Sequence, residues 1–173
     1  MTDDHTIPLI DLSEELLDRL EQIGGSRAAG STKLYRTLGN HPDQLLGWAS
    51  MAWALRQDCE TPRRLRELMI LRAVGLAGSP YAYVGHRRNA LAAGATEEEI
   101  VAVAEWRASD RFTAAEKAAF GLVDDMVVGV VRDETLAEVD AHYSIPEKIE
   151  LVLTGGFYCM TPRVLSALRV LPD

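Results

Sequence analysis

A succession of helix start and stop signals is the feature that most constrains what this chain can fold into. Thr61-Pro62 and Ser79-Pro80 each place a capping residue before a proline, which is typical of the first turn of a helix. Capping boxes, in which Thr precedes Glu by three residues, occur at 96–99 and 113–116. Apolar residues recur at helical spacing after these starts, and glycines supply the stops. We therefore predict an all-α bundle of about seven or eight helices.

Strand signals are nearly absent from the sequence. VVGVV at 127–131 is the only β-like run, and it is short enough to be the end of a helix instead. The last helix is expected to begin around Pro146 and to be disturbed by Gly155-Gly156 and Pro162, because both residue types disfavour a helix interior. The 173 residues predict a single domain over 1–173, with 1–10 as a flexible N-terminal tail.

Charge and cysteine content exclude several classes of function. The formal net charge of −8 argues against a nucleic-acid surface, because phosphate binding needs clustered Lys and Arg. No apolar run approaches the ~20 residues that a membrane-spanning helix needs. Cys59 and Cys159 are too far apart in sequence to suggest a disulfide framework or a metal site. We expect a reduced, cytoplasmic protein without nucleic-acid or membrane partners, acting on a small molecule.

Glu67 lies in the middle of a helix, predicted over 61–77, that is apolar almost all round after its first turn. A helix of this kind belongs inside a bundle or an oligomer. Burial of the carboxylate without a partner would raise its pKa toward the range that acid/base catalysis uses. The alternative is a structural ion pair with Arg63 one turn earlier, and the spacing alone favours neither.

His86 shares a helix face with small or polar residues, which leaves room around its imidazole and suits a pocket better than a packed core. Its side chain titrates near neutral pH, so it is the histidine best placed for proton transfer. Tyr83 precedes it by three residues and either forms a wall of such a pocket or donates its hydroxyl. A lone helical histidine is also commonly structural, and that alternative stays open.

The spacing of Glu67, Ser79, Ala82 and His86 resembles the core motif of the carboxymuconolactone decarboxylase and AhpD-like alkylhydroperoxidase superfamily. That motif reads Glu, eleven residues, Cys, two residues, Cys, three residues, His, and here Ser79 and Ala82 stand where the cysteines would be. YRTLGNHPDQLLGW upstream and EKIELVLTGGFYCMTPRVLSALRV downstream are also similar to the superfamily's elements. The resemblance covers roughly residues 31–170 and implies an AhpD-like helical bundle.

The resemblance implies a reaction that does not depend on a Cys-x-x-Cys pair. Peroxide reduction by AhpD-like members needs one thiolate to attack and a second thiol to resolve the product, and Ser79 and Ala82 can do neither. The cofactor-free decarboxylase branch instead implies acid/base chemistry on a small carbonyl or lactone, with His86 and Glu67 as catalytic residues and with no metal or organic cofactor. It also implies that Ser79, Tyr81 and Tyr83 bind the substrate, with hydroxyl groups that donate hydrogen bonds to a substrate oxygen. The alternatives are a thiol peroxidase using Cys59 or Cys159, and a non-catalytic member. The superfamily also implies a homo-oligomer, a trimer or a hexamer.

Overall fold

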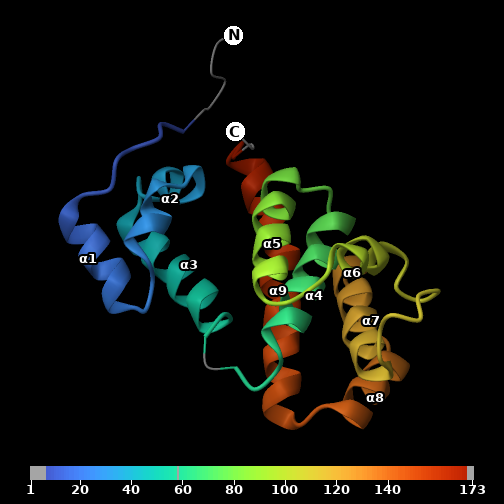
Figure 1. Cartoon of the computed structure of the whole chain (residues 1–173). Helices are drawn as coiled ribbons and strands as arrows, with labels where there is room; N and C mark the ends of the chain where they lie inside the picture. Colours follow the sequence, from blue (N-terminus) through green and yellow to red (C-terminus); the bar gives the residue numbers. More distant parts are fainter. Residues whose placement is uncertain (1–6, 58, 171–173) are drawn as a thin grey trace. The chain divides into compact units, whose positions relative to one another are not determined.

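A computed structural model describes residues 7–57 and 59–170 of the chain. These residues contain no strand, and they form nine α-helices and two short 3-10 helices, which confirms the all-α prediction (Figure 1). The helices are α1 (Glu14–Gln22), η1 (Arg27–Ser31), α2 (Lys33–Leu38), α3 (Pro42–Ala54), α4 (Arg63–Leu76), α5 (Pro80–Ala92), α6 (Glu97–Ala102), η2 (Val103–Glu105), α7 (Ala114–Val128), α8 (Asp133–His142) and α9 (Ile145–Ala167).

The chain divides into two compact units. The first comprises residues 1–58 and 164–173, and the second comprises Cys59–Arg163. The first unit buries a small apolar cluster formed by Leu16, Leu20, Tyr35, Leu45 and Ala49. The single-domain organisation stays a prediction. Residues 1–6 of the predicted tail lie outside the described residues.

The described residues of that predicted tail make hydrogen bonds to other residues of the first unit. The side-chain amide of Asn40 donates to the Pro8 carbonyl at 2.8 Å, and the Ile10 N–H donates to the Arg36 carbonyl. In the part of the chain that the structure describes, no helix has both the length and the hydropathy that crossing a membrane requires.

Helix α4 forms the centre of the second unit, where it packs against α5 and α7. Nine of its residues are buried, and all but two of them are apolar. The two exceptions are Arg66 and Glu67, which are 3% and 0% exposed. The expectation of a buried helix is therefore met within the chain itself, and α4 carries the predicted site residue Glu67 into the core.

Both predicted capping boxes are present. Thr96 caps α6 and Thr113 caps α7, and in each case the glutamate at the third helical position reaches back to the backbone N–H of the capping threonine. Gly129 then ends α7 in a left-handed conformation, with φ of 96°. The β-like run at 127–131 is thus a helix end, since its glycine adopts a conformation that other residues rarely take.

The structure corrects the predicted start of α4. Helix α4 begins at Arg63, with Pro62 rather than Thr61 at the N-cap position. Thr61 is engaged elsewhere, because its N–H and hydroxyl both donate to the carboxylate of Glu150, at 2.9 and 2.7 Å.

The predicted disturbance of the last helix is also corrected. Helix α9 runs without interruption through Gly155-Gly156 and Pro162. A Cβ atom on Gly155 would lie 2.8 Å from the sulfur of Met126, so the glycine leaves room for this side chain of α7 against α9. Tertiary packing of this kind outweighs the low helix propensity of these residues.

Candidate functional site

Glu67 and His86 meet inside the second unit. Glu67 extends from the middle of α4 and is 0% exposed, and His86 extends from α5 and is 7% exposed. The Oε2 atom of Glu67 lies 2.7 Å from Nδ1 of His86, which is the distance of a strong hydrogen bond. The sequence motif therefore corresponds to a direct contact between the two predicted catalytic side chains.

Arg63 holds the other oxygen of the same carboxylate. Its Nε and Nη2 atoms lie 2.8 and 2.6 Å from Oε1 of Glu67, one helical turn along α4. Of the two alternatives that the sequence left open, an unpartnered carboxylate and an ion pair with Arg63, the ion pair is therefore the one present, and the contact with His86 stands beside it. Each uses one carboxylate oxygen.

These two partners decide the ionisation of Glu67. Burial raises the pKa of this carboxyl group. The hydrogen bonds and charges of His86 and Arg63 lower the pKa by more than burial raises it, so the net pKa lies below its ordinary value. The raised pKa expected for an unpartnered carboxylate is therefore not found, because Glu67 has partners. At neutral pH Glu67 is an acceptor and a negative charge, and it holds no proton to donate.

Tyr158 of α9 is the site residue that the sequence analysis missed. Its ring packs against the His86 imidazole with a centroid separation of 4.7 Å and an interplanar angle of 80°. The side chain is 2% exposed. A buried tyrosine on an apolar helix carries no sequence signal for a neighbour 72 positions away, and only the packing of α9 against α5 brings the two rings together.

The three predicted substrate-binding residues lie on the first turns of α5. Ser79 is the N-cap residue, with a partly exposed side chain that makes no capping hydrogen bond. Tyr81 is also partly exposed. The Tyr83 ring lies beside Gly75, near the C-terminal end of α4, 4.0 Å from where a Cβ on that glycine would be. Their roles in substrate binding stay predictions.

The two cysteines are both partly buried and free of disulfide bonds. Burial raises the pKa of the Cys159 thiol, and the nearby Arg163 only partly offsets this. A raised pKa disfavours the thiolate that nucleophilic or redox chemistry needs. Over residues 7–57 and 59–170, no three His, Cys, Asp or Glu side chains are grouped so that they could hold a metal ion.

Comparison with known proteins supports the superfamily that the motif resembles. Residues 42–125, which include Glu67 and His86, match the family model described as the carboxymuconolactone decarboxylase family. Within the matched residues, Ser79 and Ala82 stand where the Cys-x-x-Cys pair of the motif would be. No curated protein matches the sequence.

Solved structures with the same fold share little sequence with this chain. A protein of unknown function from Agrobacterium tumefaciens, described as a putative antioxidant defence protein AhpD, is 21% identical with a TM-score of 0.72, over 79% of this chain and 95% of its own. The debrominase Bmp8 is 17% identical with a TM-score of 0.77, over 93% and 89%. An uncharacterized peroxidase-related protein from Silicibacter sp. TM1040 is 15% identical with a TM-score of 0.80, over 97% and 90%.

Proposed function

We propose that this protein catalyses proton transfer on a small carbonyl or lactone substrate, with His86 as the proton carrier and Glu67 as the group that positions it. The observation that carries the proposal is the buried 2.7 Å contact between Glu67 Oε2 and His86 Nδ1. In the proposed resting state Glu67 is ionised beside Arg63, its carboxylate accepts, and Nδ1 of a neutral imidazole carries the hydrogen. The lone pair of the ring is then at Nε2, which is the atom that takes up a proton.

The reaction follows from that tautomer. In an isomerisation, Nε2 accepts a proton from a carbon next to the carbonyl, and the electrons of the C–H bond form an enolate. The imidazolium is stabilised by Glu67 and returns the proton to a different carbon. In a decarboxylation, Nε2 has first taken up a proton from solvent, so the ring enters the step as imidazolium. The C–C bond to the substrate carboxylate breaks, CO2 leaves, and the bonding electrons form the enolate. The proton on Nε2 then passes to carbon, which returns the ring to its neutral form.

Neither reaction requires an organic cofactor or a metal, since the carbonyl group of the substrate itself accepts the electron pair. Ser79, Tyr81 and Tyr83 are the proposed donors to the oxygen on which negative charge develops. A small cyclic substrate is also compatible with this fold, because a cysteine-to-alanine variant of the debrominase Bmp8 has been solved in complex with 2,3,4-tribromopyrrole.

Assembly and location complete the proposal. We place the protein in the cytoplasm as a homo-oligomer, a trimer or a hexamer. The observation that favours assembly is a row of exposed apolar side chains along α9, at Ile145, Ile149, Leu153 and Met160. Spacings of four, four and seven residues put them on one side of the helix.

The test uses defined small molecules and does not depend on a known pathway. Carboxymuconolactone and α-angelica lactone are incubated with the protein in D2O, and loss of CO2, double-bond migration and deuterium incorporation are followed by NMR. His86→Gln is expected to lower the rate by about 10²–10⁴-fold. Glu67→Gln is expected to lower it as well, because the amide can present its NH2 to Nδ1 and favour the wrong tautomer.

His142→Gln is the matched control, since His142 is exposed at the end of α8. It should retain the wild-type rate. A His86→Gln variant with the wild-type rate would contradict the proposal. Turnover of hydroperoxide with a thiol donor, lost in Cys59→Ser or Cys159→Ser, would favour the thiol peroxidase alternative instead.

A further inference from the structure

We propose that the Nε–H group of Arg66 and the hydroxyl group of Thr154 bind one internal water molecule, which joins α4 to α9 in the second unit. The inference does not rest on the proposed function, because the proposed reaction uses neither side chain. It concerns two buried polar groups whose hydrogen bonding within the protein is incomplete.

Arg66 is a buried cation with an incomplete set of partners. Its side chain is 3% exposed, and its Nη1 atom donates to the carbonyl and to the hydroxyl of Thr61. The Nε atom is also buried, and it has no hydrogen-bond partner among the residues that the structure describes. A buried N–H group that gives up its bond to water without gaining another is costly, so native proteins rarely leave one unpaired.

The hydroxyl of Thr154 differs from those of other buried threonines in helices of this chain. Thr37 and Thr161 each donate to the carbonyl four residues earlier in their own helix, at 2.8 Å. Thr154 is 1% exposed, yet its hydroxyl makes neither this bond nor any other with the described residues. Because the hydroxyl does not bond back to its own helix, its hydrogen-bonding capacity is left for a group outside that helix.

Both residues lie where the start of α4 meets α9. The guanidinium of Arg66 bonds to the Thr61 hydroxyl at 2.9 Å, and that hydroxyl donates to the carboxylate of Glu150 on α9 at 2.7 Å. Thr154 follows Glu150 by one helical turn, about 6 Å along the axis, and lies on the same side of α9. The two unpartnered atoms therefore belong to one small region of the core, in which a single bridging molecule serves both.

The charges of this region favour water over an ion. Burial raises the pKa of Glu150, but hydrogen bonds from residues 60–61 and the charge of Arg66 lower it by a larger amount, so the carboxylate is ionised at neutral pH. Its negative charge offsets that of Arg66 and repels a second anion, and an N–H donor does not coordinate a cation. A water molecule can accept from Arg66 Nε and donate to the Thr154 oxygen, and internal waters typically make about three hydrogen bonds to such groups.

The experiment observes the water directly in the full-length protein and needs no substrate. NOE and ROE spectra of labelled protein measure magnetisation transfer from water to the Arg66 Nε–H and to the Thr154 methyl group, and they separate a bound water from hydrogen exchange. We expect both groups to show the contact of a long-lived internal water. The rate at which the Arg66 Nε–H exchanges with solvent is measured in the same samples.

Thr154→Val replaces the hydroxyl with a methyl group of similar volume. We expect the water contact at Arg66 to be lost and exchange of its Nε–H to accelerate by about tenfold, since the hydrogen bond that protects this group is removed. Thr154→Ser keeps the hydroxyl and should retain both wild-type signals.

Thr161→Val is the matched control. It removes another buried hydroxyl of α9, one that is 5% exposed and bonds back to the Phe157 carbonyl of its own helix. It should leave the water contact at Arg66 in place and the exchange rate within about twofold of wild type. If Thr154→Val does not fold, the spectra of the wild-type protein decide the question by themselves.

Three results would overturn the proposal. The first is the absence of a bound-water contact at Arg66 and Thr154 in the wild-type protein. The second is an unchanged contact in folded Thr154→Val. The third is a saturable shift of the Arg66 Nε–H signal on titration with sodium formate, which would assign the site to an anion instead.

Discussion

Glu67 is a fully buried carboxylate whose two oxygens are divided between a partly exposed arginine and a buried histidine. Removing a carboxylate from water is costly, and hydrogen bonds from both sides offset that cost. The same arrangement keeps the group ionised, which is the state that the tautomer proposed for His86 requires. A single residue is thus responsible both for stability in the core and for the chemistry proposed at Nε2.

Replacing Glu67 should therefore be strongly destabilising. Glu67→Leu leaves Arg63 and His86 without the carboxylate that they share, and we expect a loss of about 3–5 kcal/mol in the free energy of unfolding. The measurement is urea denaturation followed by circular dichroism. Glu97→Leu is the control, because the Glu97–Arg87 pair is about half exposed and such pairs contribute only ~0–1 kcal/mol. Equal losses in the two variants would show that burial of Glu67 is not important for stability.

At the scale of elements, α4 connects the second unit through arginines that point to different neighbours. Arg64 binds Glu99 and Glu116, which are the glutamates of the α6 and α7 capping boxes. Arg66 binds the hydroxyl of Thr61 at 2.9 Å. One helix thereby anchors the start of two others, as well as the segment that leads into it.

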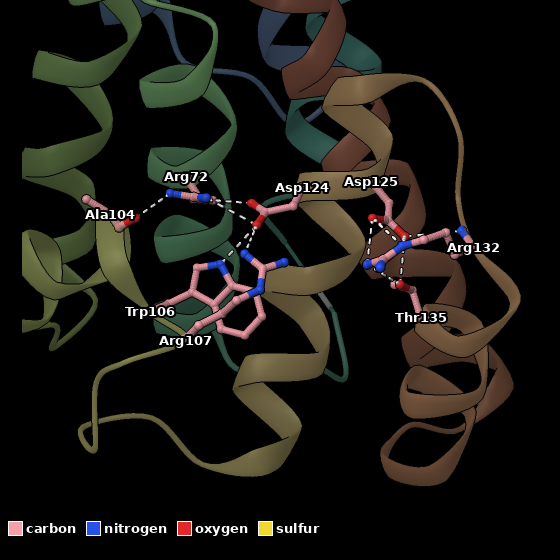
Figure 2. Close-up of polar contacts among 8 residues, drawn as sticks. All are labelled: Arg72, Ala104, Trp106, Arg107, Asp124, Asp125, Arg132 and Thr135. Carbon is pink, nitrogen blue, oxygen red and sulfur yellow. Dashed lines mark hydrogen bonds and ion pairs between the residues drawn. The ribbon is translucent and has the colours of Figure 1, made fainter.

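A further arginine of α4 extends this pattern to the body of α7. Arg72 makes two hydrogen bonds to the carboxylate of Asp124, at 2.6 and 3.1 Å, and another to the Ala104 carbonyl (Figure 2). Trp106 and Arg107 approach the same carboxylate. The apolar core of α4 therefore lies between polar contacts along its length, which fixes its register against α7.

The packing of Met126 of α7 against Gly155 of α9 gives a prediction at the scale of elements. A Cβ on Gly155 would lie 2.8 Å from the Met126 sulfur, whereas a Cβ on Gly156 would lie 3.5 Å from the Met126 methyl group, an ordinary contact. Both alanine variants gain about 0.5–1 kcal/mol of helix propensity. Only Gly155→Ala requires a side chain to shift, and because the atom in the way lies near the flexible end of Met126, we expect that shift to offset part of the gain in helix propensity.

Thermal unfolding of the two variants provides the comparison. Gly156→Ala is expected to match or exceed the wild-type stability, and Gly155→Ala to be the less stable of the two. A Gly155→Ala protein as stable as Gly156→Ala would mean that Met126 moves aside freely and that the glycine is not needed for packing.

At the scale of the whole molecule, the chain is acidic, yet several of its carboxylates titrate below their ordinary range. In each case burial raises the pKa, and hydrogen bonds to arginine, threonine or backbone groups lower it by a larger amount. The buried or partly buried members of this set are Glu67, Glu99, Glu116, Asp124, Asp125 and Glu150. All six lie in the second unit.

Asp125 is the clearest case and predicts acid sensitivity. Burial raises the pKa of Asp125, but hydrogen bonds from Arg132 and Thr135 outweigh burial and lower it from 3.8 to about 2 (Figure 2). A group with a lower pKa in the folded state stabilises the fold above its unfolded pKa, and that contribution is lost as the pH falls toward the folded value. Stability from Asp125 should therefore be complete at neutral pH and decline between about pH 4 and pH 2.

Asp125→Asn tests this dependence. At pH 7 the variant should be less stable than wild type by ~1–3 kcal/mol, since it loses charge-assisted hydrogen bonds. At pH 2 the two proteins should converge. Urea unfolding at both pH values measures the difference, and an equal gap at pH 7 and pH 2 would contradict the assigned shift.

Local signals in the sequence determined the helical class and both capping boxes. These features depend on residues a few positions apart, so periodicity and capping chemistry suffice to predict them. The pairing of Glu67 with His86 was expected only from the spacing of the motif that the chain shares with the superfamily.

Only the tertiary structure decided what surrounds those residues. It lowered the pKa of Glu67 instead of raising it, because both Arg63 and His86 reach the carboxylate. It kept α9 continuous, because packing against Met126 outweighs the propensity of Gly155. It brought Tyr158 to the imidazole from a distant helix. Contacts between residues far apart in the chain follow from how whole helices pack, and local pattern does not encode that packing.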